Sequence, residues 1–487
     1  QRLDGTWAVG PEPIIDWTPY LKGGDVYLFE PDYGEIRLTF DGAAGSAQYM
    51  GQPILSGLRL TYLRRSVADG SLQRIRRRLV GKITTAAGVA RIRHVPSTGQ
   101  SLSIGASGGG VLTTPAPSAR VLMFNGEVKT LGLLHGKEQV DMALSPDRLV
   151  DFLPAAERAI GGWGETTMTQ AGLRYAQGLP ASDAVLVSAH GIGSAAYAEL
   201  KQGTQPYKNL LTAVEAGRFN ALTAGYAHVC DTVIWDQGEG DVGAAAGHRL
   251  AALVELQANL TTDINALTGG AGQVALIAAQ TSNFTRYGFT TIRPLQQEQL
   301  LAAIQNPGKI ITPGPKYQHT YTGGDDGTHL TFIGYAREGA EQGRMASRRT
   351  AGLDTLPLYM TSAVASGGTI AVTFRIPADT SWEINTDLVS DPGNRGVSIH
   401  AADGSIASGV TITSVTQTGA GRLAVAYSGT LPAGAQVGIA AAGIAGAFAG
   451  PTTGPRSNFC AVVTDGWTYY DGTPIRMWAC HQLLAIA

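Results

Sequence analysis

Hydrophobic and polar positions follow three different patterns along the chain. In the first part, short runs of alternating character, 25–29 and 35–40, are separated by Pro and Gly. Alternation with a period of two is typical of strands that bury one face. We therefore predict a β-rich N-terminal domain over residues 1–88.

From about residue 89 to residue 345, short apolar runs alternate with longer amphipathic segments. Strands are predicted at 90–95, 120–124, 184–189, 232–235 and 273–279. Helices are predicted at 206–227, 248–267 and 293–304, and another helical pattern starts at Thr331. Strands that alternate with helices indicate an α/β domain with a parallel sheet covered on both faces. In such a sheet, ligands bind beyond the carboxyl ends of the strands.

The last part of the chain, residues 346–487, returns to a β pattern without helical periodicity. Short alternating runs lie at 369–374, 397–400, 410–415, 423–427 and 436–441, separated by Gly, Pro, Asp or Ser. This spacing favours a C-terminal β-sandwich or jelly-roll-like domain.

Composition narrows the range of partners. Only 15% of the 487 residues are charged and the net charge is −2, which argues against a dedicated nucleic-acid binder. One basic run, at 64–65 and 74–78, is better interpreted as a solvated edge or an interdomain contact than as a phosphate-binding patch. No stretch approaches 18 consecutive apolar residues, so no membrane span is expected.

The cysteines and histidines predict neither a redox compartment nor a metal site. Cys230 lies in an apolar run and is expected to be a buried thiol, whereas Cys460 and Cys480 could pair. No cluster of His, Cys and Asp has the spacing of metal ligands. We therefore expect no metal and no other cofactor.

The ends of the predicted strands carry the candidate chemistry. The first strand leads to Gly99-Gln100-Ser101, where a serine can act as a nucleophile if a base and oxyanion donors reach it. The strand at 184–189 leads to His190-Gly191-Ile192-Gly193-Ser194, whose glycines leave backbone N–H groups free to face a ligand oxygen.

Two further turns supply polar groups. Trp235-Asp236-Gln237-Gly238-Glu239-Gly240-Asp241 combines an amide with three carboxylates around two glycines. Near the end of the α/β region, Asp326 precedes His329 by three residues. An Asp at this spacing can accept a hydrogen bond from the imidazole Nδ1 and leave Nε2 facing a nucleophile.

Taken in this chain order, the four motifs resemble those of the SGNH (GDSL-type) hydrolase superfamily. Within it they resemble the sialate O-acetylesterase-like carbohydrate esterases, and the Trp-x-Gln-Gly-Glu-x-Asp motif is the most specific of the four. The resemblance covers residues 89–345 and implies a flavodoxin-like hydrolase domain.

The resemblance also implies roles for individual residues. Ser101 would be the nucleophile, His329 the base and Asp326 the acid that orients the imidazole. The oxyanion hole would consist of the Ser101 and Gly193 backbone N–H groups and the side-chain amide of Gln237.

Two departures from the family pattern leave alternatives open. The second motif reads Gly-Ile-Gly rather than Gly-Gly, so Gly191 and Gly193 are both candidate oxyanion donors. The usual Asn of the third motif is absent, and Gln237 takes its place by resemblance to the subgroup. Glu239 and Asp241 are expected to support the loop, and Asp325 to be a loop residue rather than the orienting acid.

The leading hypothesis is a serine esterase that removes acetyl groups from a carbohydrate or polysaccharide. One alternative is a hydrolase of short-chain lipids or thioesters. Another is a phage tail or adhesin protein that binds glycans and has a weak or inactive hydrolase domain, which the β-rich flanks would allow. We expect an extracellular, periplasmic or virion-associated location, although no leader is visible, and the sequence leaves the oligomeric state open.

Overall fold

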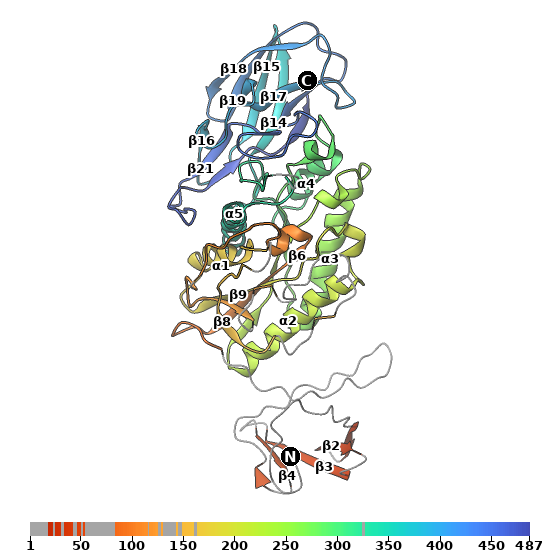
Figure 1. The fold of residues 1–487 in the computed structure, drawn as a ribbon, viewed down its shortest axis with the longest axis vertical. Coiled ribbons are helices and arrows are strands. Elements are labelled where there is room, and N and C mark those ends of the chain that lie inside the picture. Colours follow the sequence, from red (N-terminus) through yellow and green to blue (C-terminus); the bar gives the residue numbers. More distant parts are fainter. Residues whose placement is uncertain are drawn as a thin grey trace. The chain divides into compact units, whose positions relative to one another are not determined.

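The computed structural model describes residues 83–487 except 115, 125–127, 130–142, 145–148, 160–162 and 324–326. Before residue 83 it describes only the backbone of strands between residues 18 and 53. The chain divides into two compact units, Gln1–Gly81 and Lys82–Ala487 (Figure 1).

The first unit contains one antiparallel sheet in which neighbouring strands follow the chain order. Its strands are β1 (Thr18–Lys22), β2 (Asp25–Glu30), β3 (Gly34–Asp41), β4 (Ser46–Tyr49) and β5 (Gln52–Pro53). The two alternating runs of this region form β2 and β3. The basic run at 64–78 lies outside the described residues.

The second unit begins with the predicted α/β sheet. Its strand order is β13-β12-β11-β6-β9-β7-β8, and β10 pairs with β6. The bounds are β6 (Arg91–Gly99), β7 (Val121–Phe124), β8 (Phe152–Pro154), β9 (Asp183–Ala189), β10 (Ala227–Val229), β11 (Thr232–Asp236), β12 (Ala275–Ile277) and β13 (Ile310–Ile311). All pairings are parallel except that of β7 with β8.

The strand order confirms the predicted fold class. The five strands β9-β6-β11-β12-β13 have the flavodoxin-like order, and β7 and β8 extend the sheet beyond β9. The first strand, β6, therefore lies between β9 and β11. The chain adds β9 on one side of β6 and then adds β11, β12 and β13 on the other side. The carboxyl end of β6 is the topological switch point at which this fold binds ligands.

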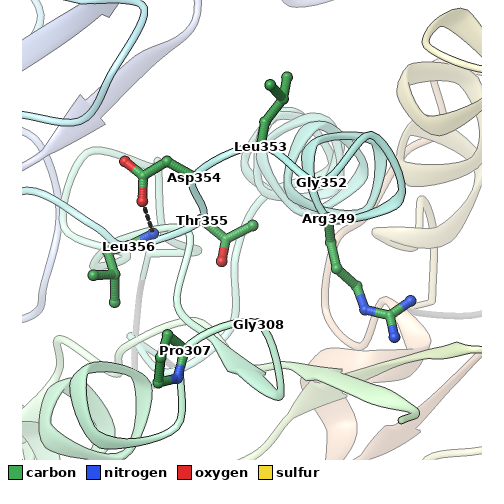
Figure 2. A pocket seen from close by; sticks show the side chains of 8 residues that line it. All are labelled: Pro307, Gly308, Arg349, Gly352, Leu353, Asp354, Thr355 and Leu356. Atoms are coloured by element: carbon green, nitrogen blue, oxygen red, sulfur yellow. Dashed lines mark hydrogen bonds between the residues drawn. The ribbon is translucent and has the colours of Figure 1, made fainter. Parts of the chain in front are cut away.

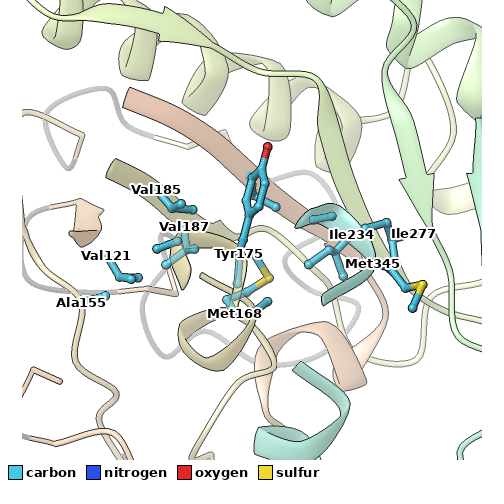
Figure 3. Packing of buried hydrophobic residues seen from close by; sticks show 14 of the residues in the cluster. Val121, Ala155, Met168, Tyr175, Val185, Val187, Ile234, Ile277 and Met345 are labelled. Atoms are coloured by element: carbon cyan, nitrogen blue, oxygen red, sulfur yellow. The ribbon is translucent and has the colours of Figure 1, made fainter. Parts of the chain in front are cut away.

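Helices cover both faces of the sheet. They are α1 (Met168–Gln177), α2 (Gln205–Thr223), α3 (His248–Thr268), α4 (Pro294–Gln305) and α5 (Phe332–Thr350). On one face, α1 and α5 pack against valines and isoleucines of the strands, such as Val187 and Ile234 (Figure 3). On the other, α2, α3 and α4 pack around Trp235 and Leu276. The long helices were predictable from their periodicity, whereas α1 and the short strands β8, β10 and β13 were not.

The C-terminal region consists of three antiparallel sheets around one core, which confirms its predicted β character. The four-stranded sheet contains β14 (Tyr359–Ser366), β15 (Thr369–Arg375), β19 (Arg422–Ser428) and β18 (Thr411–Gly419). One three-stranded sheet contains β16 (Thr380–Ile384), β21 (Phe459–Val463) and β22 (Arg476–Trp478). The other contains β17 (Val397–His400), β20 (Gln436–Ile439) and β23 (Gln482–Ala485).

The C-terminal sheets pack directly on the α/β region within the same compact unit. Gln280, which follows β12, accepts a hydrogen bond from the His481 N–H (2.7 Å) and donates one to the His481 carbonyl (2.8 Å). The His481 imidazole lies 2.7 Å from Ser282 Oγ. The three-part division at residues 88 and 345 stays a prediction, and α5 runs across the second of these boundaries to Thr350.

Cys230, Cys460 and Cys480 are all buried and free, so the possible pair Cys460–Cys480 is not formed. None of the helices in the described ranges is both long and apolar enough to cross a membrane.

Candidate active site

Ser101 lies directly after the central strand β6. It begins a short 3₁₀ helix, Ser101–Ile104, and is 7% exposed. The turn depends on Gly99, which has φ = 142°. A Cβ at Gly99 would lie 2.3 Å from the backbone oxygen of Asp236, so only glycine lets the ends of β6 and β11 approach this closely. The Gln100 N–H then donates to the Asp236 carbonyl at 3.0 Å.

The structure brings Ser101 together with His329. The distance between Ser101 Oγ and His329 Nε2 is 2.6 Å, although 228 residues separate them in the chain. His329 lies shortly before α5, whose N-cap residue Thr331 accepts a hydrogen bond from the Gly334 N–H. The His329 carbonyl also accepts one from the Thr322 N–H at 2.8 Å. A half-buried imidazole in contact with a serine hydroxyl is the arrangement that activates a serine nucleophile.

The predicted orienting acid lies outside the described residues. Asp326 and its neighbour Asp325 both belong to the segment 324–326. The choice of Asp326 as the partner of the His329 imidazole therefore stays a prediction.

The glycine loop after β9, residues 190–194, lies against residues 99–105, the turn that carries the predicted nucleophile Ser101 (the nucleophile turn). The Ile192 N–H donates to the Gly99 carbonyl at 3.0 Å. A Cβ at Gly191 would lie 1.7 Å from Ser103 Oγ, so Gly191 provides close contact between the two loops. In the part of the chain that the structure describes, no backbone acceptor pairs with the N–H of Ser101 or of Gly193. The choice of Gly193 over Gly191 as an oxyanion donor stays a prediction.

The side-chain amide of Gln237 has two acceptors inside the protein. Its nitrogen lies 2.7 Å from Asp241 Oδ2 and 3.2 Å from the Ala195 carbonyl oxygen. Each of the two amide hydrogens therefore has a partner, whereas Gln237 Oε1 is buried without one. The predicted oxyanion role of Gln237 requires one of these bonds to open when substrate binds.

The two acidic residues of the same loop have different surroundings. Asp241 Oδ2 accepts from the Tyr197 N–H (3.0 Å), from Gln237 and from Arg249 Nη2 (3.0 Å). Asp241 thus holds the loop 236–241 in place through these hydrogen bonds, which agrees with the supporting role predicted for it. Glu239 is buried, and its carboxylate lies 4.0 Å from Lys316 Nζ.

Lys316 is the cation beneath this loop. Its ammonium lies 3.3 Å from Glu338 Oε1. Burial alone disfavours the charged form, but the carboxylates of Glu338, Glu239 and Asp236 outweigh it and raise the pKa of Lys316. The buried carboxylates therefore face a permanent positive charge.

Sequence reasoning did not assign a role to Gln100. Its Oε1 accepts hydrogen bonds from the Gly240 N–H (3.2 Å) and the Gly238 N–H (3.5 Å). Gln100 thus links the nucleophile turn to the Gln-Gly-Glu loop. Its place between Gly99 and Ser101 in the first motif was the only signal for this role.

The segment that contains the buried carboxylate of Glu165 contacts the end of the nucleophile turn through its backbone. Glu165 accepts from the N–H groups of Leu112 (2.7 Å) and Thr113 (3.2 Å) and from Thr113 Oγ1 (2.7 Å). The Gly164 N–H donates to the Gly105 carbonyl at the end of the 3₁₀ helix. Burial and the nearby carboxylate of Glu157 raise the pKa of Glu165 to about 7.

His190 is fully buried, and its Nε2 lies 2.8 Å from Ser188 Oγ. Burial lowers the pKa of His190 to about 3. His190 is therefore a packed neutral histidine behind the glycine loop rather than a residue that faces substrate.

We expect His190 to make the protein less stable in mild acid. Below the ordinary pKa of 6.5 the unfolded chain takes up a proton on this imidazole and the folded chain does not. The free energy of unfolding therefore decreases as the pH falls from 6.5 towards 3. Chemical denaturation of wild type and His190→Gln at pH 7 and pH 5 should show that the variant loses about 2 kcal/mol less unfolding free energy.

Glu165 has the opposite effect on stability, because its pKa is about 7 in the folded chain and 4.5 in the unfolded chain. Both proteins contain Glu165, so its effect cancels when their unfolding free energies are compared. The exposed His248 provides the control. If the unfolding free energy of wild type, His190→Gln and His248→Gln changed equally between pH 7 and pH 5, His190 would not be a histidine that stays neutral in the folded chain.

A separate pocket of ≈ 340 Å³ lies at the end of α5 (Figure 2). It is lined by Pro307, Gly308, Arg349, Gly352, Leu353, Asp354, Thr355 and Leu356. None of the predicted site residues lines it. Among the described residues, no group of three or more His, Cys, Asp or Glu side chains is placed to hold a metal ion.

No protein-family model matches the chain, and no curated protein matches it. Similar solved structures include the carbohydrate acetylesterase XAC1771 from Xanthomonas citri, with 14% identity, a TM-score of 0.49 and coverage of 92% of this chain and 85% of that one. NanS has 13% identity, a TM-score of 0.38 and coverage of 54% and 98%. Est24 from Sinorhizobium meliloti, a carbohydrate acetylesterase, has 13% identity, a TM-score of 0.28 and coverage of 53% of this chain and 99% of that one. These identities are too low to transfer an activity from those proteins to this chain.

Proposed function

We propose that this protein is a serine esterase that removes O-acetyl groups from a carbohydrate or polysaccharide. The observation that carries the proposal is the 2.6 Å contact between Ser101 Oγ and His329 Nε2 at the carboxyl end of the central strand. A serine is a weak nucleophile at its ordinary pKa and needs an adjacent base. The switch point of an α/β sheet is also the place where this fold binds ligands.

In the first step, Ser101 Oγ attacks the acetyl carbonyl and His329 Nε2 accepts the hydroxyl proton. The tetrahedral intermediate carries a negative oxygen, which the N–H groups of Ser101 and Gly193 would bind. The intermediate collapses as the bond to the sugar oxygen breaks. The imidazolium of His329 gives its proton to that oxygen, and the sugar alcohol leaves.

In the second step, water replaces the sugar. His329 takes a proton from the water molecule, the resulting hydroxide attacks the acetyl-Ser101 ester, and the same N–H groups bind the second oxyanion. Breaking the ester bond releases acetate and returns the proton to Ser101.

The preference for short acyl groups rests on the surroundings of the serine. Polar side chains close to the nucleophile turn, those of Gln100, Gln237 and Asp241, are engaged in hydrogen bonds. The apolar side chains next to it, those of Leu102 and Leu330, are buried in the core. A long acyl chain needs an apolar groove, and the sequence shows no apolar loop dedicated to one. The carbohydrate part of the proposal follows the motif resemblance.

The test is a series of p-nitrophenyl esters together with a panel of O-acetylated polysaccharides. We expect kcat/KM to fall at least about tenfold between the acetyl and octanoyl esters, and acetate release from one or more polysaccharides. The Ser101→Ala protein provides the background rate of hydrolysis for each substrate. A higher kcat/KM for octanoate would favour a lipid hydrolase, and no turnover of any ester would favour a glycan-binding protein.

A further inference from the structure

One loop of the C-terminal β region is fixed against a turn of the α/β region. The loop spans residues 441–450, and the turn is the 3₁₀ helix Phe284–Tyr287 with the residues up to Ile292. Four hydrogen bonds join the two segments: Ile292 N–H to Ala441 O (2.8 Å), Gly443 N–H to Thr290 O (2.9 Å), Gly446 N–H to Thr285 O (2.7 Å) and Thr285 Oγ1 to Ala447 O (2.6 Å). These hydrogen bonds fix the loop and the turn to each other.

The same loop extends to the segment that carries His329. The ring of Phe448 covers Gly327, two residues before His329, and a Cβ at Gly327 would lie 2.3 Å from that ring. The Arg286 guanidinium lies 5.4 Å from the centre of the Phe448 ring. The C-terminal region thus contacts the active-site segment directly, rather than only the outer helices.

Tyr287 connects this turn to the residue next to His329. Its hydroxyl lies 3.3 Å from Thr328 Oγ1. Although it is anchored in this way, the Tyr287 side chain is 39% exposed, and Ile444 on the neighbouring loop is 79% exposed. A solvent-accessible aromatic ring whose hydroxyl contacts Thr328, the residue before the predicted base, has the chemistry to pack on the C–H face of a sugar.

We propose that the turn Phe284–Tyr287 and the loop 441–450 form one wall of the substrate site, in which Tyr287 contacts the sugar ring that bears the acetyl group. The C-terminal β region then takes part in choosing the carbohydrate, because its loop holds this wall in place. This inference rests on the proposed esterase function and adds the residues that determine its specificity.

The experiment compares Tyr287→Ala and Tyr287→Phe with wild type on two substrates, p-nitrophenyl acetate and glucose penta-acetate. For Tyr287→Ala we expect KM for the acetylated sugar to rise about tenfold, with kcat changed less than about threefold. Activity on p-nitrophenyl acetate should stay within about threefold, because that ester has no sugar ring. Tyr287→Phe keeps the ring but loses the hydroxyl contact with Thr328, so its KM for the acetylated sugar should lie closer to that of wild type than to that of Tyr287→Ala.

Ile444→Ser and Ile406→Ser are a matched pair of exposed isoleucines. Ile406 follows β17 near Gln436, at the opposite end of the β17–β20 pair from the loop 441–450, and is 51% exposed. We expect Ile444→Ser to raise KM for the acetylated sugar about threefold and Ile406→Ser to leave it unchanged.

Two results would overturn the inference: an unchanged sugar KM in Tyr287→Ala, or an equal loss of kcat on both substrates, which would mean that Tyr287 only holds the His329 segment. Failure of the esterase proposal looks different, because wild type would then show no Ser101-dependent hydrolysis of either ester. In that case, titration calorimetry with the deacetylated polysaccharides tests whether Tyr287 contacts the sugar. Weaker binding by Tyr287→Ala supports it, and equal or absent binding rejects it.

Discussion

Replacing Ser101 with alanine is expected to lower kcat/KM for p-nitrophenyl acetate at least about a thousandfold. The variant removes the oxygen that lies 2.6 Å from His329 Nε2, so no acyl-enzyme can form. The N–H groups proposed to bind the oxyanion stay in place, which leaves a small residual rate above that of water. The change is measured by steady-state kinetics, with thermal unfolding to verify that the variant is folded.

Ser103 offers a control on the same short helix. Its hydroxyl donates to the Gln100 carbonyl at 2.7 Å, so it has a supporting contact rather than a place beside His329. We expect Ser103→Ala to keep kcat/KM within about tenfold of wild type. His329→Gln should lose nearly as much activity as Ser101→Ala, because residues that act as a unit are not additive. Hydrolysis that survives Ser101→Ala would refute the nucleophile assignment.

A large loss of stability is expected from Gly343→Ala in α5. A Cβ at Gly343 would lie 2.2 Å from the backbone oxygen of Ala171 in α1, and one at Gly339 would lie 2.0 Å from that of Thr167. In an isolated helix, Gly→Ala stabilises by about 1 kcal/mol. Here the two helices would have to move apart, and overpacking of this kind costs about 1–3 kcal/mol.

Denaturant unfolding measures this effect, and Gly243→Ala is the control because a Cβ there meets nothing within 4 Å. We expect the midpoint to fall clearly for Gly343→Ala and to change little for Gly243→Ala. Equal midpoints for Gly343→Ala and wild type would show that α1 and α5 can separate without cost.

Periodicity predicted the parts of the fold that are long and regular. The helices α2, α3 and α4 each present repeated apolar side chains to the sheet, and that repeat is a local property of the chain. Helix α1 was missed because it has only ten residues, most of which are buried against α5 and the sheet. The two-residue strand β13 is also too short to carry a period.

The sequence by itself determined the order of the motifs and the strand ends that carry them. Turn glycines and polar residues after apolar runs are local signals, so Ser101 and His329 could be selected from the chain alone. Tertiary structure decided which of these groups touch: the Ser101–His329 contact, the Gln100 tether to the Gly238–Gly240 loop and the contact of Phe448 with Gly327. These contacts join residues more than 100 positions apart, and no local pattern encodes such a distance because it depends on how strands and helices pack.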